Sequence, residues 1–213
     1  MSEAIGTGLL TATVVGSGMM AERLCGGNIA LALLANTLAT AAALVALILT
    51  FGPISGAHFN PVVTLASAWQ RNLAWPDVPA YLFSQVAGAV SGVAVAQLMF
   101  GEALFSLSQH ARKGGAQFFS EFIATFGLVT VILVCGRLRA QVTPFAVAAY
   151  IAAAYWFTAS TSFANPAVTI GRALTNSFAG IRPVDVPAFV VAQFLGTIAA
   201  TLLGGWLIQE QRK

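Results

Sequence analysis

Two asparagine–proline pairs provide polar chemistry inside long apolar stretches of this chain. Asn60 precedes Pro61 and Asn165 precedes Pro166, and neither pair has a charged residue close by. Asparagine is a good helix N-cap, and proline suits the first helical position because its missing N–H would be unpaired there. Each pair therefore predicts a helix that begins within an apolar region and carries a side-chain amide able to donate a hydrogen bond to a passing oxygen atom.

The composition places these pairs in a lipid bilayer. Of 213 residues, 58% are hydrophobic and 8% are charged, whereas soluble proteins carry about 25% charged residues. We therefore expect one all-α membrane domain over residues 1–213. The basic residues are scattered, which argues against a nucleic-acid partner. Cys25 and Cys135 lie far apart in sequence, so no disulfide framework, metal site or cofactor is expected.

Stretches without charged residues indicate how often the chain crosses the membrane. Four of these stretches have about the length of one crossing: 4–21, 78–101, 122–136 and 186–209. The stretches 24–70 and 140–171 are longer than one crossing needs, and each contains one asparagine–proline pair. A helix from Pro61 to about Gln70 would be about 15 Å long, half of the roughly 30 Å hydrocarbon thickness. Each long stretch thus predicts a span and a half-helix, with irregular backbone at a depth where it must be buried or line a cavity.

The chain contains two copies of one unit. Three motifs recur in the same order: Ser2-Glu3-Ala4-Ile5-Gly6-Thr7 as Ser120-Glu121-Phe122-Ile123-Ala124-Thr125, Asn60-Pro61-Val62-Val63-Thr64 as Asn165-Pro166-Ala167-Val168-Thr169, and Gln85-Val86-Ala87-Gly88 as Gln193-Phe194-Leu195-Gly196. Each unit has three spans, so the second copy is inverted and the N-termini of the two half-helices meet at the membrane midplane. We expect repeat 1 over about 1–101, a linker over about 102–115 and repeat 2 over about 116–213.

Three ionisable residues fall at membrane depth. An ionisable group inside a span is costly and is usually functional or partnered. Glu3 and Glu121 occupy matching positions of the two copies, which favours loop-anchoring carboxylates that accept backbone N–H groups over a proton relay. His58, two residues before Asn60, is expected to anchor the same loop, with a pH-dependent gate as the alternative.

These motifs resemble those of the aquaporin and aquaglyceroporin channels, the major intrinsic protein family, and the resemblance covers the whole chain. It is carried by Ser55-Gly56-Ala57-His58-Phe59-Asn60-Pro61-Val62-Val63-Thr64, by Asn165-Pro166-Ala167-Val168-Thr169, and by the paired glutamates and Gln-x-x-Gly motifs. The resemblance implies an aquaporin-like fold of six tilted transmembrane helices and two re-entrant half-helices. It also implies a homotetramer with one pore per protomer, a multi-pass location in the cell (inner) membrane, and both termini in the cytoplasm.

The pore midplane that this resemblance implies comprises Asn60, Pro61, Val62, Asn165, Pro166 and Ala167. Each half-helix carries about half a positive charge at its N-terminus, and the two N-termini converge. Cations and protons therefore meet an electrostatic barrier, whereas neutral molecules do not. Val62 stands where the second copy has Ala167, and it either narrows the midplane or repacks the junction.

Channels of this family have a constriction on the outer side of the midplane, formed by four positions. On ungapped spacing these are Thr40, Ala153, Ser162 and Val168. The last position is usually arginine in the family, and its replacement by valine predicts a filter without arginine. A ring of small side chains should be wide, which argues against strict water selectivity.

Arg172 could supply the missing cation. It lies four residues after Val168, on the same helix face and one turn nearer the outer mouth. We expect its guanidinium to reach the outer vestibule, and the alternative is an arginine that extends to lipid headgroups.

The expected function is a passive channel for small uncharged solutes and water that excludes ions and protons. Glycerol, urea and neutral metalloid hydroxides such as arsenous acid have the expected size and hydrogen-bonding pattern. A water-selective aquaporin is one alternative. A secondary carrier is another, because carriers also use inverted repeats and broken helices, but they usually bury a charged site. An enzyme is not expected, since no nucleophile–base pair, carboxylate pair or metal cluster is evident.

Overall fold

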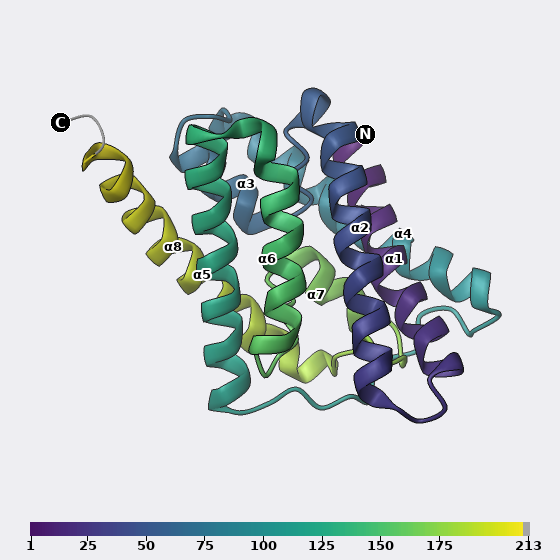
Figure 1. Ribbon diagram of the computed structural model, residues 1–213. Coiled ribbons are helices and arrows are strands. Elements are labelled where there is room, and N and C mark those ends of the chain that lie inside the picture. The colour runs from purple at the N-terminus through teal and green to yellow at the C-terminus, as the bar shows by residue number, and fades with distance from the viewer. Residues whose placement is uncertain (211–213) are drawn as a thin grey trace.

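The computed structural model describes residues 1–210, with side chains up to residue 205, and its regular elements in this part are helices (Figure 1). The α-helices are α1 (Ser2–Leu24), α2 (Ile29–Ser55), α3 (Pro61–Trp69), α4 (Val78–Phe100), α5 (Gly115–Leu138), α6 (Thr143–Phe157), α7 (Pro166–Arg172) and α8 (Val186–Glu210). Short 3-10 turns at Trp75–Asp77, Ala140–Val142 and Pro183–Asp185 lead into α4, α6 and α8.

Within the described residues, six helical segments are long and apolar enough to cross a membrane, and α3 and α7 are short helices between them. Figure 1 shows α3 in one half of the molecule and α7 in the other, with the long helices around them. The predicted all-α, aquaporin-like arrangement of six spans and two half-helices is confirmed. The first half-helix ends at Trp69, and Gln70, the predicted end, is its C-cap.

Small residues let the spans of each repeat approach closely. In the first repeat α1 packs mainly on α4, and in the second α5 packs on α8. A Cβ atom on Gly88 of α4 would collide with the carbonyl oxygen of Ala4, and one on Gly196 of α8 would collide with that of Phe122. Membrane helices associate through such close packing, because lipid provides no hydrophobic driving force between them. The two crossings place Gln85 and Gln193 beside the re-entrant loops.

Local sequence defines where several of these helices begin and end. The Asn28 side chain caps α2 by accepting a hydrogen bond from the Leu31 N–H at 3.1 Å. Gly56 ends the same helix in the left-handed conformation, with φ of 82°. A glycine adopts this conformation without steric penalty, so the chain turns there into the first re-entrant loop.

Candidate functional site

Each half-helix starts at an asparagine that caps it. The Oδ1 atom of Asn60 accepts a hydrogen bond from the Val62 N–H at 3.1 Å. The Oδ1 atom of Asn165 accepts two, from the N–H groups of Ala167 at 3.0 Å and Val168 at 3.2 Å. Each side-chain amide oxygen therefore faces the first turn of its own half-helix, and each amide nitrogen faces away from that half-helix.

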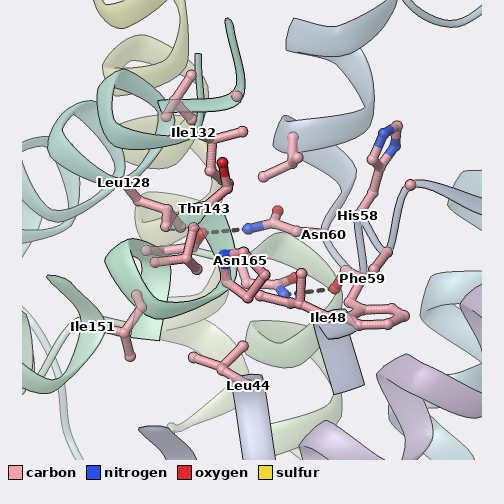
Figure 2. Close-up of a pocket in the computed structure, with 18 of the residues that line it drawn as sticks. Leu44, Ile48, His58, Phe59, Asn60, Leu128, Ile132, Thr143, Ile151 and Asn165 are labelled. Atoms are coloured by element: carbon pink, nitrogen blue, oxygen red, sulfur yellow. Dashed lines mark hydrogen bonds between the residues drawn. The ribbon is translucent and has the colours of Figure 1, made fainter. Parts of the chain in front are cut away.

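The two amide nitrogens connect the re-entrant loops to each other. Nδ2 of Asn60 donates to the carbonyl oxygen of Ala164 at 2.7 Å, and Nδ2 of Asn165 donates to that of Phe59 at 2.8 Å. Figure 2 shows this reciprocal pair of hydrogen bonds as dashed lines in the centre of the cavity. An asparagine amide nitrogen has two N–H groups. One on each asparagine is thus used to join the loops, and one remains for another acceptor.

The loops before the asparagines contain left-handed residues that are not glycine. In the first loop Ala57 and Phe59 have φ of 48° and 50°, and in the second loop Thr161, Ser162 and Ala164 have φ of 60°, 50° and 47°. Such backbone is unfavourable by about 1–3 kcal/mol per residue and persists only where its surroundings hold it. Ala57 and Phe59 occupy the positions that match Ser162 and Ala164 of the second copy, so one backbone design is used twice.

Glu3 holds the first loop from α1. Its Oε1 atom accepts the Ser55 hydroxyl at 2.6 Å and the His58 N–H at 3.0 Å. Its Oε2 atom accepts the Phe59 N–H at 2.7 Å and the Gln85 amide at 2.8 Å. Four donors therefore satisfy a carboxylate that is 3% exposed, as a buried charge requires.

Glu121 has the equivalent role in the second loop. Its oxygens accept the backbone N–H groups of Phe163 at 2.8 Å and Ala164 at 2.9 Å. The Gln193 amide donates to the same carboxylate at 2.7 Å and also to the Thr169 hydroxyl at 3.0 Å. Each carboxylate thus joins a span, a strained loop and a glutamine of the neighbouring span.

His58 is half-buried at the wall of the cavity. Its Nδ1 atom lies 3.1 Å from the Thr64 hydroxyl, and its ring centre lies 5.3 Å from that of Tyr81. The Thr64 hydroxyl also accepts a hydrogen bond from Gln85 at 2.8 Å. His58 is therefore joined to the same network as Glu3.

A central cavity of about 720 Å³ runs between the spans and both re-entrant loops. Half of the predicted site residues line it, namely Thr40, His58, Asn60, Ser162, Asn165, Val168 and Arg172. Pro61, Val62, Pro166 and Ala167 are buried but do not line it. Val62 is 0% exposed.

The cavity has one apolar wall and one polar edge. The apolar wall comes from α2, α5 and α6 and includes Leu44, Ile48, Leu128, Ile132, Val147 and Ile151. The polar edge comes from the loops, with the amides of Asn60 and Asn165 (Figure 2). A small molecule with carbon on one side and hydroxyl groups on the other matches both surfaces.

The structure corrects the position assigned to Ala153. This residue is exposed on the outside of α6 and does not line the cavity. Tyr155, 4% exposed, lines it instead, and its hydroxyl donates to the Thr40 hydroxyl at 3.3 Å. Two residues along an α-helix correspond to about 200° of rotation, so counting back from Asn165 without a gap selected the opposite face. The four-residue spacing of Val147, Ile151 and Tyr155 is the sequence signal that identifies the correct face.

Arg172, the last residue of α7, is buried at the cavity. It is 3% exposed, its Nε donates to the Ala179 carbonyl, and its Cζ lies 3.3 Å from the ring centre of Phe163. This burial is incompatible with the alternative in which the side chain extends to lipid headgroups.

Arg112 lies against the same aromatic ring, and nothing in the sequence pattern of the 102–115 linker identified it. Its Cζ is 4.9 Å from the Phe163 ring centre, and its Nε and Nη1 donate to the carbonyls of Gly180 and Ser160 at 2.9 and 3.1 Å. Burial lowers the pKa of the Arg112 guanidinium, while the nearby Glu121 carboxylate acts in the opposite direction. The second loop therefore carries a cationic cluster around Phe163.

Comparisons with known proteins agree with this architecture. The family described as "Major intrinsic protein" matches residues 1–144. Aquaglyceroporin AqpS of Rhizobium meliloti is 53% identical over 212 residues, which cover 100% of this chain and 91% of that protein. Aquaporin NIP1-1 of Oryza sativa subsp. japonica is 33% identical over 77% of this chain and 57% of its own length.

A solved structure has the same fold. The X-ray structure of the aquaglyceroporin from Plasmodium falciparum superposes with a TM-score of 0.67, covering 94% of this chain and 92% of that chain at 20% identity. The family match, the relative that aligns over the full chain and the six apolar spans establish that the chain belongs to the major intrinsic protein family, as a multi-pass membrane channel for small neutral solutes and not an enzyme.

Proposed function

We propose that this chain is a passive channel for small polyols of the size of glycerol, with water passing through the same pore. The observation that carries the proposal is the cavity, which has an apolar wall on one side and amide donors on the other. The carbon backbone of a polyol can contact the wall while its hydroxyl groups bind the amides. The relative AqpS, named an aquaglyceroporin, supports the same cargo.

The barrier to ions comes from the paired half-helices. Each N-terminus carries about half a positive charge, and both face the centre of the pore, where the Asn60 and Asn165 amides are held. A cation is repelled there, and a water molecule that accepts from both amides cannot relay a proton. We assign the midplane to the two half-helix starts, Asn60-Pro61-Val62 and Asn165-Pro166-Ala167.

The outer constriction, in this proposal, is formed by Thr40, Tyr155, Ser162 and Val168. Tyr155 takes the place first assigned to Ala153, so one side of the ring is aromatic and amphipathic. Val168 supplies no hydrogen-bond donor and no charge. Such a constriction favours cargo with its own carbon surface, because position 168 has no fixed donor to replace the hydrogen bonds of water.

Arg172 provides the positive charge of the outer vestibule in place of an arginine at position 168. Its burial beside the cavity, one turn beyond Val168, supports this assignment. Glu3, Glu121 and His58 act as loop anchors and do not take part in a proton relay. This assignment is supported by the backbone N–H groups that the two carboxylates accept and by the hydrogen bond between His58 and Thr64.

We further propose a homotetramer in which 1–213 forms one channel domain per protomer, with repeat 1 over about 1–101, a linker over about 102–115 and repeat 2 over about 116–213. The exposed apolar side chains of α2, such as Leu31, Leu34 and Leu38, support a surface that contacts lipid or another protomer. Crosslinking in native membranes, with a tetramer as the expected product, tests the oligomer.

Urea and neutral metalloid hydroxides such as arsenous acid are further candidate cargo, because they are uncharged and of polyol size or smaller. Stopped-flow light scattering on proteoliposomes, with gradients of glycerol, urea, arsenous acid or an impermeant osmolyte, tests all of them. We expect glycerol to enter at least about tenfold faster than through bare lipid, a barrier difference of about 1.4 kcal/mol.

Each alternative has its own outcome in this experiment. A water-selective aquaporin would give fast osmotic shrinkage and glycerol entry at the rate of bare lipid. A secondary carrier would give glycerol flux that saturates or depends on an ion gradient. Glycerol and water both at the bare-lipid rate would overturn the channel itself.

A further inference from the structure

The outer end of the cavity holds a buried arginine without an acidic partner. The ion pairs within the described residues are Arg23–Glu102 and Arg182–Asp185, and neither includes Arg172. The Arg172 side chain donates from Nε to the Ala179 carbonyl and lies on the Phe163 ring. A cation that is buried without a counter-charge is strongly unfavourable unless something else compensates it.

The terminal nitrogens of Arg172 are available for such a partner. A guanidinium has five N–H groups, four of them on the two terminal nitrogens. Within the described residues, no hydrogen bond joins these nitrogens to a protein atom. Since the residue lines the cavity, the cavity is where a partner can reach them. The planar pair of terminal nitrogens matches the two oxygens of a carboxylate.

Two neighbouring groups strengthen the case for an anion. The Arg112 guanidinium lies on the same ring as Arg172 and adds a second positive charge. Carbonyl oxygens hold it in place, so it contributes charge but does not fill the cavity. Ser162 lines the cavity and is 3% exposed, and its buried hydroxyl has no hydrogen-bond partner within the described residues. Ser162 directly precedes Phe163 in the second loop, and its hydroxyl offers a further hydrogen-bond donor.

We propose that the outer end of the cavity is a binding site for a small monovalent oxyanion of the size of formate or acetate, held by the Arg172 guanidinium and the Ser162 hydroxyl. Thr40, Tyr155 and Val168 line the same cavity, Tyr155 is hydrogen-bonded to Thr40, and Val168 lies one helical turn before Arg172. We infer that these side chains restrict the ligand to a small one. The burial of Arg172 excludes a lipid headgroup, because a headgroup cannot leave the bilayer surface to reach it.

A bound anion would obstruct the channel. It would lie about one helical turn, about 5.4 Å, from Val168 and would therefore stand in the path of neutral solutes. This consequence rests on the proposed function, whereas anion binding itself does not.

Thermal unfolding of the detergent-solubilised protein tests binding directly, with sodium formate compared with sodium gluconate at equal ionic strength. A ligand that binds the folded state raises Tm in a saturable manner. We expect formate to do so in the wild type and in R23M, which removes an exposed arginine from α1. R172M should lose the effect, and S162A should weaken the apparent affinity for formate severalfold. A wild-type Tm that responds equally to formate and gluconate would overturn the site.

R172K and S162A keep the test decisive if R172M does not fold. Lysine retains the charge but lacks the paired nitrogens, so the apparent affinity for formate should fall at least about threefold in R172K. Wild-type affinity in both R172K and S162A would mean that formate binds elsewhere and would sink the proposal.

Glycerol flux tests the obstruction separately. With formate at equal concentration on both sides of the vesicle membrane, wild-type and R23M glycerol flux should fall at least about twofold, and S162A flux should fall less. Undiminished wild-type flux at saturating formate would disprove obstruction. Vesicles that carry no glycerol at all would instead defeat the proposed function, and the thermal experiment would still decide the binding site.

Discussion

The two re-entrant loops share a scaffold but differ in the side chains around it. Both have left-handed residues, a glutamate that accepts two backbone N–H groups of the loop, and an asparagine that donates to the opposite loop. Around the first loop lie His58 and Tyr81, and around the second lie Phe163 and two arginines. What both loops share therefore holds the backbone, and what only one has supplies the local chemistry.

The loops also differ in how they pack against the first span of their own repeat. Phe59 lies on Gly6 of α1, where a Cβ atom would overlap its ring. The matching positions of the second copy are Ala164 and Ala124, both 0% exposed. One copy thus pairs a large side chain with a glycine, and the other has buried alanines at both matching positions.

The largest expected effect comes from removing a loop anchor. In E3L four donors lose their acceptor, and in E121L three do, at about 1–3 kcal/mol for each buried group. We expect neither variant to give a monodisperse channel in fluorescence-detected size-exclusion chromatography. E22L, which changes an exposed glutamate of α1, serves as the control. If E121L were as stable as E22L, the shared scaffold would not be what holds the second loop.

The packing difference between the copies predicts strong coupling between Gly6 and Phe59. G6A should destabilise the protein by about 1–3 kcal/mol through overpacking, and F59A by about 3–5 kcal/mol through a cavity. The double variant G6A/F59A restores the alanine pair of the second copy, so it should be less destabilised than the sum of the single variants. Thermal unfolding of all four proteins measures this, and additive effects would contradict the packing argument.

The asparagines should differ modestly, because Asn165 caps two N–H groups and Asn60 caps one. Loss of a cap costs about 0.5–2 kcal/mol, and N165A should lie nearer the upper end than N60A. Both should increase proton leak, which a pH-sensitive dye inside proteoliposomes reports. If N60A and N165A were equally stable and both excluded protons as well as the wild type does, the assignment of the pore midplane to these asparagines would be wrong.

The smallest expected effect separates the two faces of α6. Y155A widens the proposed constriction, so the permeability to a four-carbon polyol relative to glycerol should rise severalfold, by up to about 1 kcal/mol of barrier. A153V changes the outside of the same helix and should leave this ratio unchanged. If A153V changed this ratio and Y155A did not, Ala153 and not Tyr155 would line the constriction.

Several features of the fold follow from local sequence. The apolar stretches specify six spans, because lipid tolerates few charges. The asparagine–proline pairs specify where the half-helices begin, since capping and the missing proline N–H act over a few residues. The odd number of spans in each copy specifies the inversion. These inferences hold because each depends on neighbouring residues or on the bilayer, and not on distant contacts.

The details of the constriction could not be obtained in the same way. Which α6 residue faces the cavity depends on the number of residues in the loop before Asn165, and an error of two residues changes the face. Arg112 reaches Phe163 from the linker, and Arg172 turns onto the same ring, through contacts between segments far apart in the chain. Sequence alone thus determined the membrane architecture and the paired asparagines. Only tertiary structure decided which side chains meet at the outer end of the pore, because a side chain's neighbours there come from separate helices and loops.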